Sequence, residues 1–136
     1  MKKYPLTILV HVAICILSFM PVPETPLSDV AFIDKWTHLV MYGGLTLTIW
    51  FEYLRLHGLR LGRTLHGLRY AEVNHGRLLT VALLWPVVLG GLVEVLQENC
   101  TNHVRSGDWI DWLADAAGSV IAWLLCYVVI KVIKWQ

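Results

Sequence analysis

Acidic, histidine, tyrosine and glutamine side chains recur at helical spacing in three stretches of the chain. Within each stretch the residues are three or four positions apart, which places them on one face of a helix. The three sets are Asp34, His38 and Tyr42; Glu94 and Gln97; and Asp108, Asp111 and Asp115. Imidazole and carboxyl groups that lie together can transfer protons, and carboxylates can also hold a divalent cation.

Each set lies at one end of an apolar segment. Hydrophobic residues make up 57% of the 136-residue chain and charged residues only 15%, with a mean hydropathy of +0.58. This composition is typical of a small integral membrane protein, and the net charge of +1 argues against nucleic-acid binding. The sequence therefore predicts an all-α, polytopic membrane protein with residues 1–136 as a single domain. We expect four transmembrane helices, over residues 4–23, 34–54, 78–97 and 109–130.

The lysine and arginine residues predict how these helices are oriented. Nine of the eleven basic residues precede the first helix, follow the fourth or lie in the loop 55–77. Because basic loops stay in the cytoplasm, we expect both termini there, in a multi-pass protein of the cell membrane. Eight of the ten acidic residues then fall at or near the outer face. The three polar sets are therefore predicted to form one cluster at the outer end of the bundle.

Depth decides which way these side chains point. Asp115 lies ~10 Å further along its helix than Asp108, and a carboxylate inside the bilayer costs at least ~2.5–3.5 kcal/mol when it faces lipid. The carboxylates must therefore face the bundle interior and find partners there. In one interpretation these groups only satisfy one another and hold the helices together, and small residues help the packing. The small residues are Gly43, Gly44, Gly90, Gly91, Ala114, Ala117 and Gly118. In the other interpretation they form a functional site.

Two functional roles are open to these residues. Candidates for acid–base catalysis are Asp34, His38, Glu94, Asp111 and Asp115. Candidates for ligand binding are Lys35, Tyr42, Gln97, Arg105 and Asp108. Arg105 suits a phosphate or a carboxylate, because a guanidinium group binds two oxygens at once. The sequence assigns no cofactor and no metal site, and a divalent ion held by the carboxylates is left open.

The same residues resemble the VanZ-like family of small integral membrane proteins. One matching block is Asp34-Lys35-x-x-His38-x-x-x-Tyr42-x-x-Leu45. The other is Glu94-x-x-Gln97 followed by Arg105-x-x-Asp108-x-x-Asp111-x-x-x-Asp115-x-x-Gly118. Together the blocks cover the second to fourth predicted helices. The family usually has Asn at the position of Asp115, so a role of that Asn does not transfer directly to this chain.

The resemblance implies a cell-envelope protein, since the family takes its name from a protein associated with resistance to teicoplanin, a glycopeptide with a fatty acyl chain. We therefore expect the outer polar site to bind a membrane lipid, a lipid-linked envelope precursor or a lipoglycopeptide. Two alternatives stay open. One is a membrane-embedded enzyme that acts on an outer-leaflet lipid through Asp, His and Glu acid–base chemistry, so the sequence leaves enzymatic activity undecided. The other is a proton or ion pathway through Asp115 and Glu94.

Overall fold

The described part of the chain is entirely helical. A computed structural model describes residues 4–20, 33–57, 74–100 and 108–133, and no strand occurs among them. The helices are α1 (Pro5–Phe19), α2 (Ile33–His57), α3 (His75–Leu79), the π-helical turn η5 (Thr80–Leu84), α4 (Trp85–Cys100) and α5 (Trp109–Ile133). The prediction of an all-α protein is confirmed for these residues. Most of the loop 55–77, which was expected to be cytoplasmic, lies outside the described residues.

Helix ends differ from the expected limits for local reasons. α1 ends at Phe19 rather than near residue 23, because Met20 already has an extended backbone. A proline disfavours the helical conformation of the residue before it, and Pro21 follows Met20. α2 continues to His57 and α5 to Ile133, about one turn beyond the apolar stretches that predicted them.

Two helical segments are long and apolar enough to cross a membrane. They are Gly76–Cys100, which joins α3, η5 and α4, and Trp109–Lys131 of α5. Only 33% and 22% of their most apolar windows are buried inside the molecule, unlike the core helix of a soluble protein. α1 is apolar but has only 15 residues, and α2 has 25 residues with charged groups near both ends.

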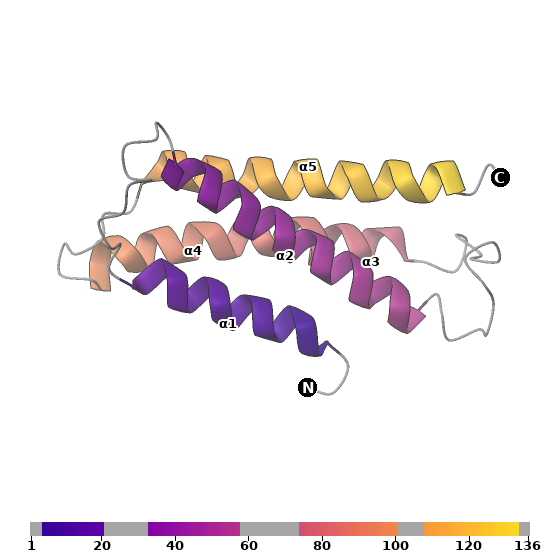
Figure 1. Ribbon diagram of the computed structural model, residues 1–136, viewed down its shortest axis with the longest axis horizontal. Helices are drawn as coiled ribbons and strands as arrows, with labels where there is room; N and C mark the ends of the chain where they lie inside the picture. The colour runs from indigo at the N-terminus through magenta and orange to yellow at the C-terminus, as the bar shows by residue number, and fades with distance from the viewer. Residues whose placement is uncertain (1–3, 21–32, 58–73, 101–107, 134–136) are drawn as a thin grey trace.

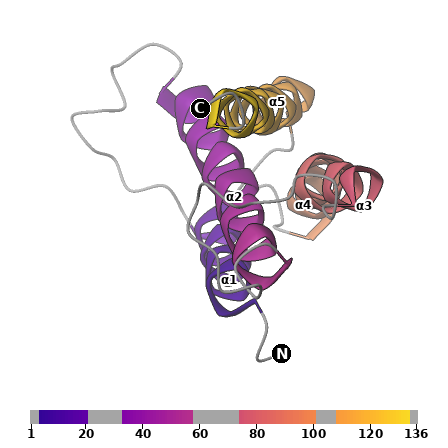
Figure 2. The same ribbon diagram turned by 90° about the vertical axis from the view of Figure 1, so that its right-hand side faces the viewer.

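α2 packs against α1, η5, α4 and α5. Figure 1 shows it running obliquely from the start of α5 toward the start of α1. Seen from the end, α1, α4 and α5 are arranged around α2 (Figure 2). The apolar core follows from this arrangement, since most of its buried side chains come from α2 and the rest from α1, α3 and η5. These residues are Ile14, Tyr42, Leu45, Ile49, Trp50, Tyr53, Leu78 and Ala82.

The most extensive contact in the bundle is between α2 and α5, and small residues allow it. Gly43 of α2 faces the backbone of Gly118 of α5, and a Cβ atom at Gly43 would lie 3.3 Å from the Gly118 carbonyl oxygen. A Cβ atom at Gly118 would overlap the backbone of Leu39. Backbones that touch in this way are typical of helices that associate in a membrane. The crossing also sets the distance between His38 and Asp115, which lie one turn away.

A π-helical turn interrupts the helix that precedes the polar cluster. The N–H of Trp85 donates to the carbonyl of Thr80, five residues back, rather than four. Pro86 follows at once, and it has no N–H to continue the ladder, while its ring crowds the carbonyl four residues earlier. The wider turn is a common way to accommodate such a break. A proline at this position is expected to kink the helix, and the disturbance lies in the turn just before it.

Buried polar groups hold both ends of α1. The carboxylate of Glu52, 1% exposed, accepts hydrogen bonds from the backbone N–H groups of Leu6 and Thr7, each at 2.9 Å. At the other end, the side-chain amide of Gln97 donates to the Ser18 carbonyl at 2.7 Å. A helix leaves its first N–H groups and last carbonyls without internal partners, and these two residues supply them. α2 and α4 thus fix α1 in the bundle.

Gly118→Ala is expected to destabilise the protein, because the added methyl group would push α2 away from α5. Overpacking of this kind lowers the free energy of unfolding by ~1–3 kcal/mol. Gly44→Ala is the matched control, since nothing lies within 4 Å of its Cβ position. It should be neutral or stabilise by up to ~1 kcal/mol, the difference in helix propensity. The free energy of unfolding of both variants is measured by SDS titration in mixed micelles, with circular dichroism as the signal. Equal stability of the two variants would contradict the close crossing.

Candidate functional site

The three polar sets of the sequence meet at one end of the bundle. The beginning of α2, the end of α4 and the beginning of α5 lie together there, on the left in Figure 1. The side chains that they bring together are Asp34, Lys35, His38, Glu94, Asp108, Asp111 and Asp115. His38, Glu94, Asp111 and Asp115 are buried, with exposures of 4%, 7%, 5% and 0%. The predicted convergence is therefore present among the described residues, while the roles assigned to them stay predictions.

One part of the site is organised around Lys35, and we call Asp34, Lys35, Asp108 and Asp111 the lysine cluster. The Lys35 Nζ atom lies 2.7 Å from Asp111 Oδ1, 3.2 Å from Asp108 Oδ2 and 3.7 Å from Asp34 Oδ2. Asp34 and Asp108 are partly exposed, and Asp111 is not. One ammonium group thus bridges carboxylates of α2 and of the start of α5.

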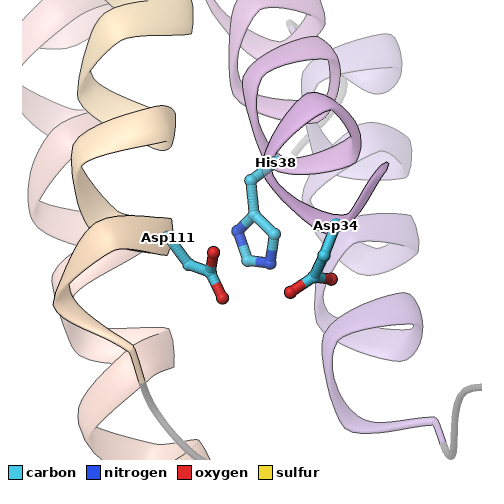
Figure 3. Close-up of side chains that lie close together, drawn as sticks. All are labelled: Asp34, His38 and Asp111. Carbon is cyan, nitrogen blue, oxygen red and sulfur yellow. The ribbon is translucent and has the colours of Figure 1, made fainter. Parts of the chain in front are cut away.

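The deeper part of the site is organised around His38, and we call His38, Glu94 and Asp115 the histidine cluster. Nδ1 of His38 is hydrogen bonded to Oδ1 of Asp115 at 2.9 Å, and it lies 3.8 Å from Oε1 of Glu94. The three residues come from α2, α4 and α5. The ring also approaches the lysine cluster, because Asp34 and Asp111 point toward it (Figure 3). His38 therefore belongs to the histidine cluster and also lies next to the lysine cluster.

Asp108 connects the two clusters through its backbone. Its N–H donates to Glu94 Oε2 at 2.8 Å, and its own carboxylate accepts from the N–H of Ile110 at the start of α5. An aspartate before the first residue of a helix satisfies an N–H that has no partner within the helix. The Ile110 N–H, and then the Lys35 ammonium, lower the pKa of Asp108 below its ordinary value. Asp108 is thus a helix cap as well as a member of the lysine cluster.

Several buried oxygens of the site have no hydrogen-bond partner among the described residues. They are Glu94 Oε1, Asp115 Oδ2 and the hydroxyl of Tyr42. Tyr42 is 0% exposed, lies one turn below His38 on α2 and interacts electrostatically with Asp115 and Glu94. Gly90 of α4 allows the Asp115 carboxylate to lie against its backbone, where a Cβ atom would collide with Oδ2. Buried polar atoms without partners are rare in native proteins.

Two residues predicted to bind a ligand have other outcomes. Gln97 is buried, and its amide donates to Ser18 of α1. A role of Gln97 in ligand binding stays a prediction. Arg105, which was expected to bind a phosphate or a carboxylate, lies outside the described residues.

Glu52 has a buried structural role that the sequence did not reveal. It is one of the two acidic residues that the sequence does not place at the outer face, and no periodicity links it to the start of α1. A signal was present, since α1 begins at Pro5 after Tyr4, whose side chain makes no capping hydrogen bond. A helix that starts without a local cap needs an acceptor from elsewhere.

Comparison of the chain with protein-family models, with curated proteins and with solved structures finds no match. Function has to be inferred from the side chains and their geometry.

Lys35→Met is expected to destabilise the protein, because it leaves the carboxylate of Asp111 buried without its cation. Hydrogen bonds to charged groups of this kind contribute ~1.5–3 kcal/mol. Asp111→Leu should have a similar effect, and the double variant should lose less than the sum, since this pair then leaves no buried charge behind. The free energies of unfolding of the two single variants and the double variant, measured in mixed micelles, complete the double-mutant cycle. Glu98→Gln, at an exposed position, is the control. Strictly additive losses would show that the 2.7 Å pair does not couple the two helices.

Proposed function

We propose that this chain is a VanZ-like, four-span protein of the cell envelope, with both termini in the cytoplasm. Its polar site at the outer face binds the polar part of a membrane lipid, a lipid-linked precursor or a lipoglycopeptide, and so contributes to teicoplanin tolerance. The observation that carries this proposal is the convergence of His38, Glu94, Asp111 and Asp115, all buried, at one end of the bundle. Ionisable groups at such positions are costly and mark functional sites.

Packing supports the proposal of four spans. α4 and α5 carry the two segments that are long and apolar enough to cross a membrane, and α1 and α2 run beside them through the same bundle (Figures 1 and 2). Many large apolar side chains face outward, as expected for contact with lipid. Among them are Leu9 at 65%, Val95 at 60% and Leu125 at 58% exposure. The basic residues of the sequence supply the orientation.

The chemistry of the site indicates which polar groups it would bind. Carboxylates accept hydrogen bonds from hydroxyl and ammonium groups, both of which occur on glycopeptides and on glycosylated lipids. Trp36, Trp109 and Trp112 are exposed beside the lysine cluster, at 60%, 70% and 39%. Their rings suit the membrane interface, where a lipid-linked ligand would approach. The described part of the site has five carboxylates against Lys35 and His38. Without a further cation it would repel a phosphate.

A membrane-embedded enzyme is the second candidate, and one distance favours it. The 2.9 Å bond between His38 and Asp115 holds the imidazole in place, as an acid–base catalyst requires. Such an enzyme would act on an outer-leaflet lipid. Mass spectrometry of lipid extracts tests this alternative. A lipid product present with the wild-type protein and absent with His38→Ala would favour catalysis over binding.

Cysteine labelling tests the proposed topology. In a background in which Cys15, Cys100 and Cys126 are replaced by serine, a membrane-impermeant maleimide should label Leu27→Cys in intact cells. It should label Leu65→Cys only after the cells are opened, because the basic loop is expected in the cytoplasm. Labelling of Leu65→Cys in intact cells would contradict the four-span arrangement.

Expression in a teicoplanin-susceptible bacterium tests the proposed function. The wild-type chain should raise the inhibitory concentration of teicoplanin, and not that of a glycopeptide without an acyl chain, if ligand binding involves the membrane. Glu94→Gln and His38→Ala should abolish the effect, because they alter buried groups of the site. Glu98→Gln, an exposed carboxylate one turn from Glu94, is the matched control and should behave as wild type. Unchanged susceptibility with the wild-type protein present in the membrane would contradict the proposal.

A further inference from the structure

Both clusters of the site have more carboxylates than cations, and they differ in how deeply the charges are buried. In the lysine cluster, the ammonium group of Lys35 lies between three carboxylates. In the histidine cluster, two buried carboxylates face one imidazole, and the described residues supply no second cation. Buried charge is normally paired. The histidine cluster therefore has a deficit of positive charge at the place where water is least available to compensate for it.

Two unpartnered oxygens lie at this position. Glu94 Oε1 and Asp115 Oδ2 belong to side chains that are more than nine-tenths buried, and neither oxygen has a hydrogen-bond partner among the described residues. Their other oxygens are engaged, by the N–H of Asp108 and by His38. Each carboxylate is thus held in place by one oxygen. The second oxygen of Glu94 lies 3.8 Å from His38 Nδ1, whereas the second oxygen of Asp115 lies against the backbone of Gly90.

The spacing of the three residues suits a metal ion. One ligand atom from each of His38, Glu94 and Asp115 can be chosen so that all three lie within 4.8 Å of one another. The distances from His38 Nδ1 are 2.9 Å to Asp115 Oδ1 and 3.8 Å to Glu94 Oε1. A first-row divalent ion has bonds of ~2.0–2.2 Å to nitrogen and oxygen, which places its ligand atoms ~3–4 Å apart. Only small side-chain movements are needed to bring these groups around one ion.

We propose that His38, Glu94 and Asp115 form a binding site for a divalent transition-metal ion. An imidazole with two carboxylates is a donor set that suits Zn²⁺, Co²⁺ or Mn²⁺. Three protein ligands leave at least one coordination position open, for water or for an oxygen of a bound molecule. The hydroxyl of Tyr42, buried one turn further along α2, has no hydrogen-bond partner among the described residues. This inference rests on the proposed function, because the ion would lie in the same site.

Metal binding to the purified protein tests the inference. Protein without an affinity tag is stripped with EDTA in detergent micelles and then titrated with Co²⁺, while visible absorption reports the ligand field. Bound Zn²⁺ is measured separately by mass spectrometry of the metal. We expect about one ion per chain for both metals. We also expect a higher melting temperature with Zn²⁺, because the ion binds the folded protein.

Variants assign the ion to these residues. His38→Ala and Glu94→Gln should weaken Co²⁺ binding by at least about tenfold and change or abolish its spectrum. Glu98→Gln is the control for a carboxylate of the same helix outside the site. A triple variant, His57→Gln, His66→Gln and His75→Gln, removes the histidines of the loop and should bind Co²⁺ as wild type does. Equal binding by His38→Ala, or loss of binding in the triple variant alone, would overturn the assignment.

The remaining outcomes are also decisive. Less than stoichiometric binding by the wild-type chain overturns the proposal, whether or not the variants fold. If the wild-type chain binds no ion but Arg105→Gln binds one, a cation of the chain itself fills the site and the proposal is wrong. None of these measurements needs a lipid or an antibiotic. Stoichiometric metal binding without a change in teicoplanin tolerance would therefore support the metal site and contradict only the proposed function.

Discussion

The hydrogen bond between His38 and Asp115 is the interaction on which the rest of the site depends. It joins α2 to α5 inside the bundle, where an unpaired carboxylate would be strongly unfavourable. The bond is possible because Gly43 and Gly118 let the two backbones touch one turn away. Gly90 gives α4 the same close approach to Asp115. Small residues thus allow the helices to approach closely, and the polar side chains then meet at hydrogen-bonding distance.

Much of this arrangement follows from the sequence, because helical periodicity and the cost of burying charge are both local rules. The spacing of Asp34, His38 and Tyr42 predicts one helical face, and the apolar surroundings require that face to point inward. The same reasoning applies to Asp111 and Asp115. The structure places four of these five side chains in the site and buries Tyr42 just below it.

Which side chains of different helices pair with one another could not be predicted in this way. The pairing depends on how each helix is rotated about its axis and how far it is shifted along the bundle, and the periodicity of one sequence gives neither. Gln97 lies on the same face as Glu94, yet its side-chain amide donates to the carbonyl of Ser18 in α1. Glu52 caps α1 from a position 45 residues away in the chain. The sequence makes Lys35 a candidate for ligand binding, and only the structure shows it bridging Asp108 and Asp111. Local rules predicted the polar faces, whereas the partners depend on the bundle as a whole.

The balance of charge decides which ligand such a site can take. As described, the acidic groups outnumber the basic ones, so hydroxyl or ammonium groups are favoured and phosphates are repelled. A divalent ion at the histidine cluster would reverse this preference, because bound cations are often the largest local charges in a site. The open coordination position would then attract a phosphate or carboxylate oxygen, the groups that lipid-linked precursors and peptides carry. Whether the histidine cluster holds an ion is therefore the property that separates a sugar- or amine-binding site from an anion-binding one.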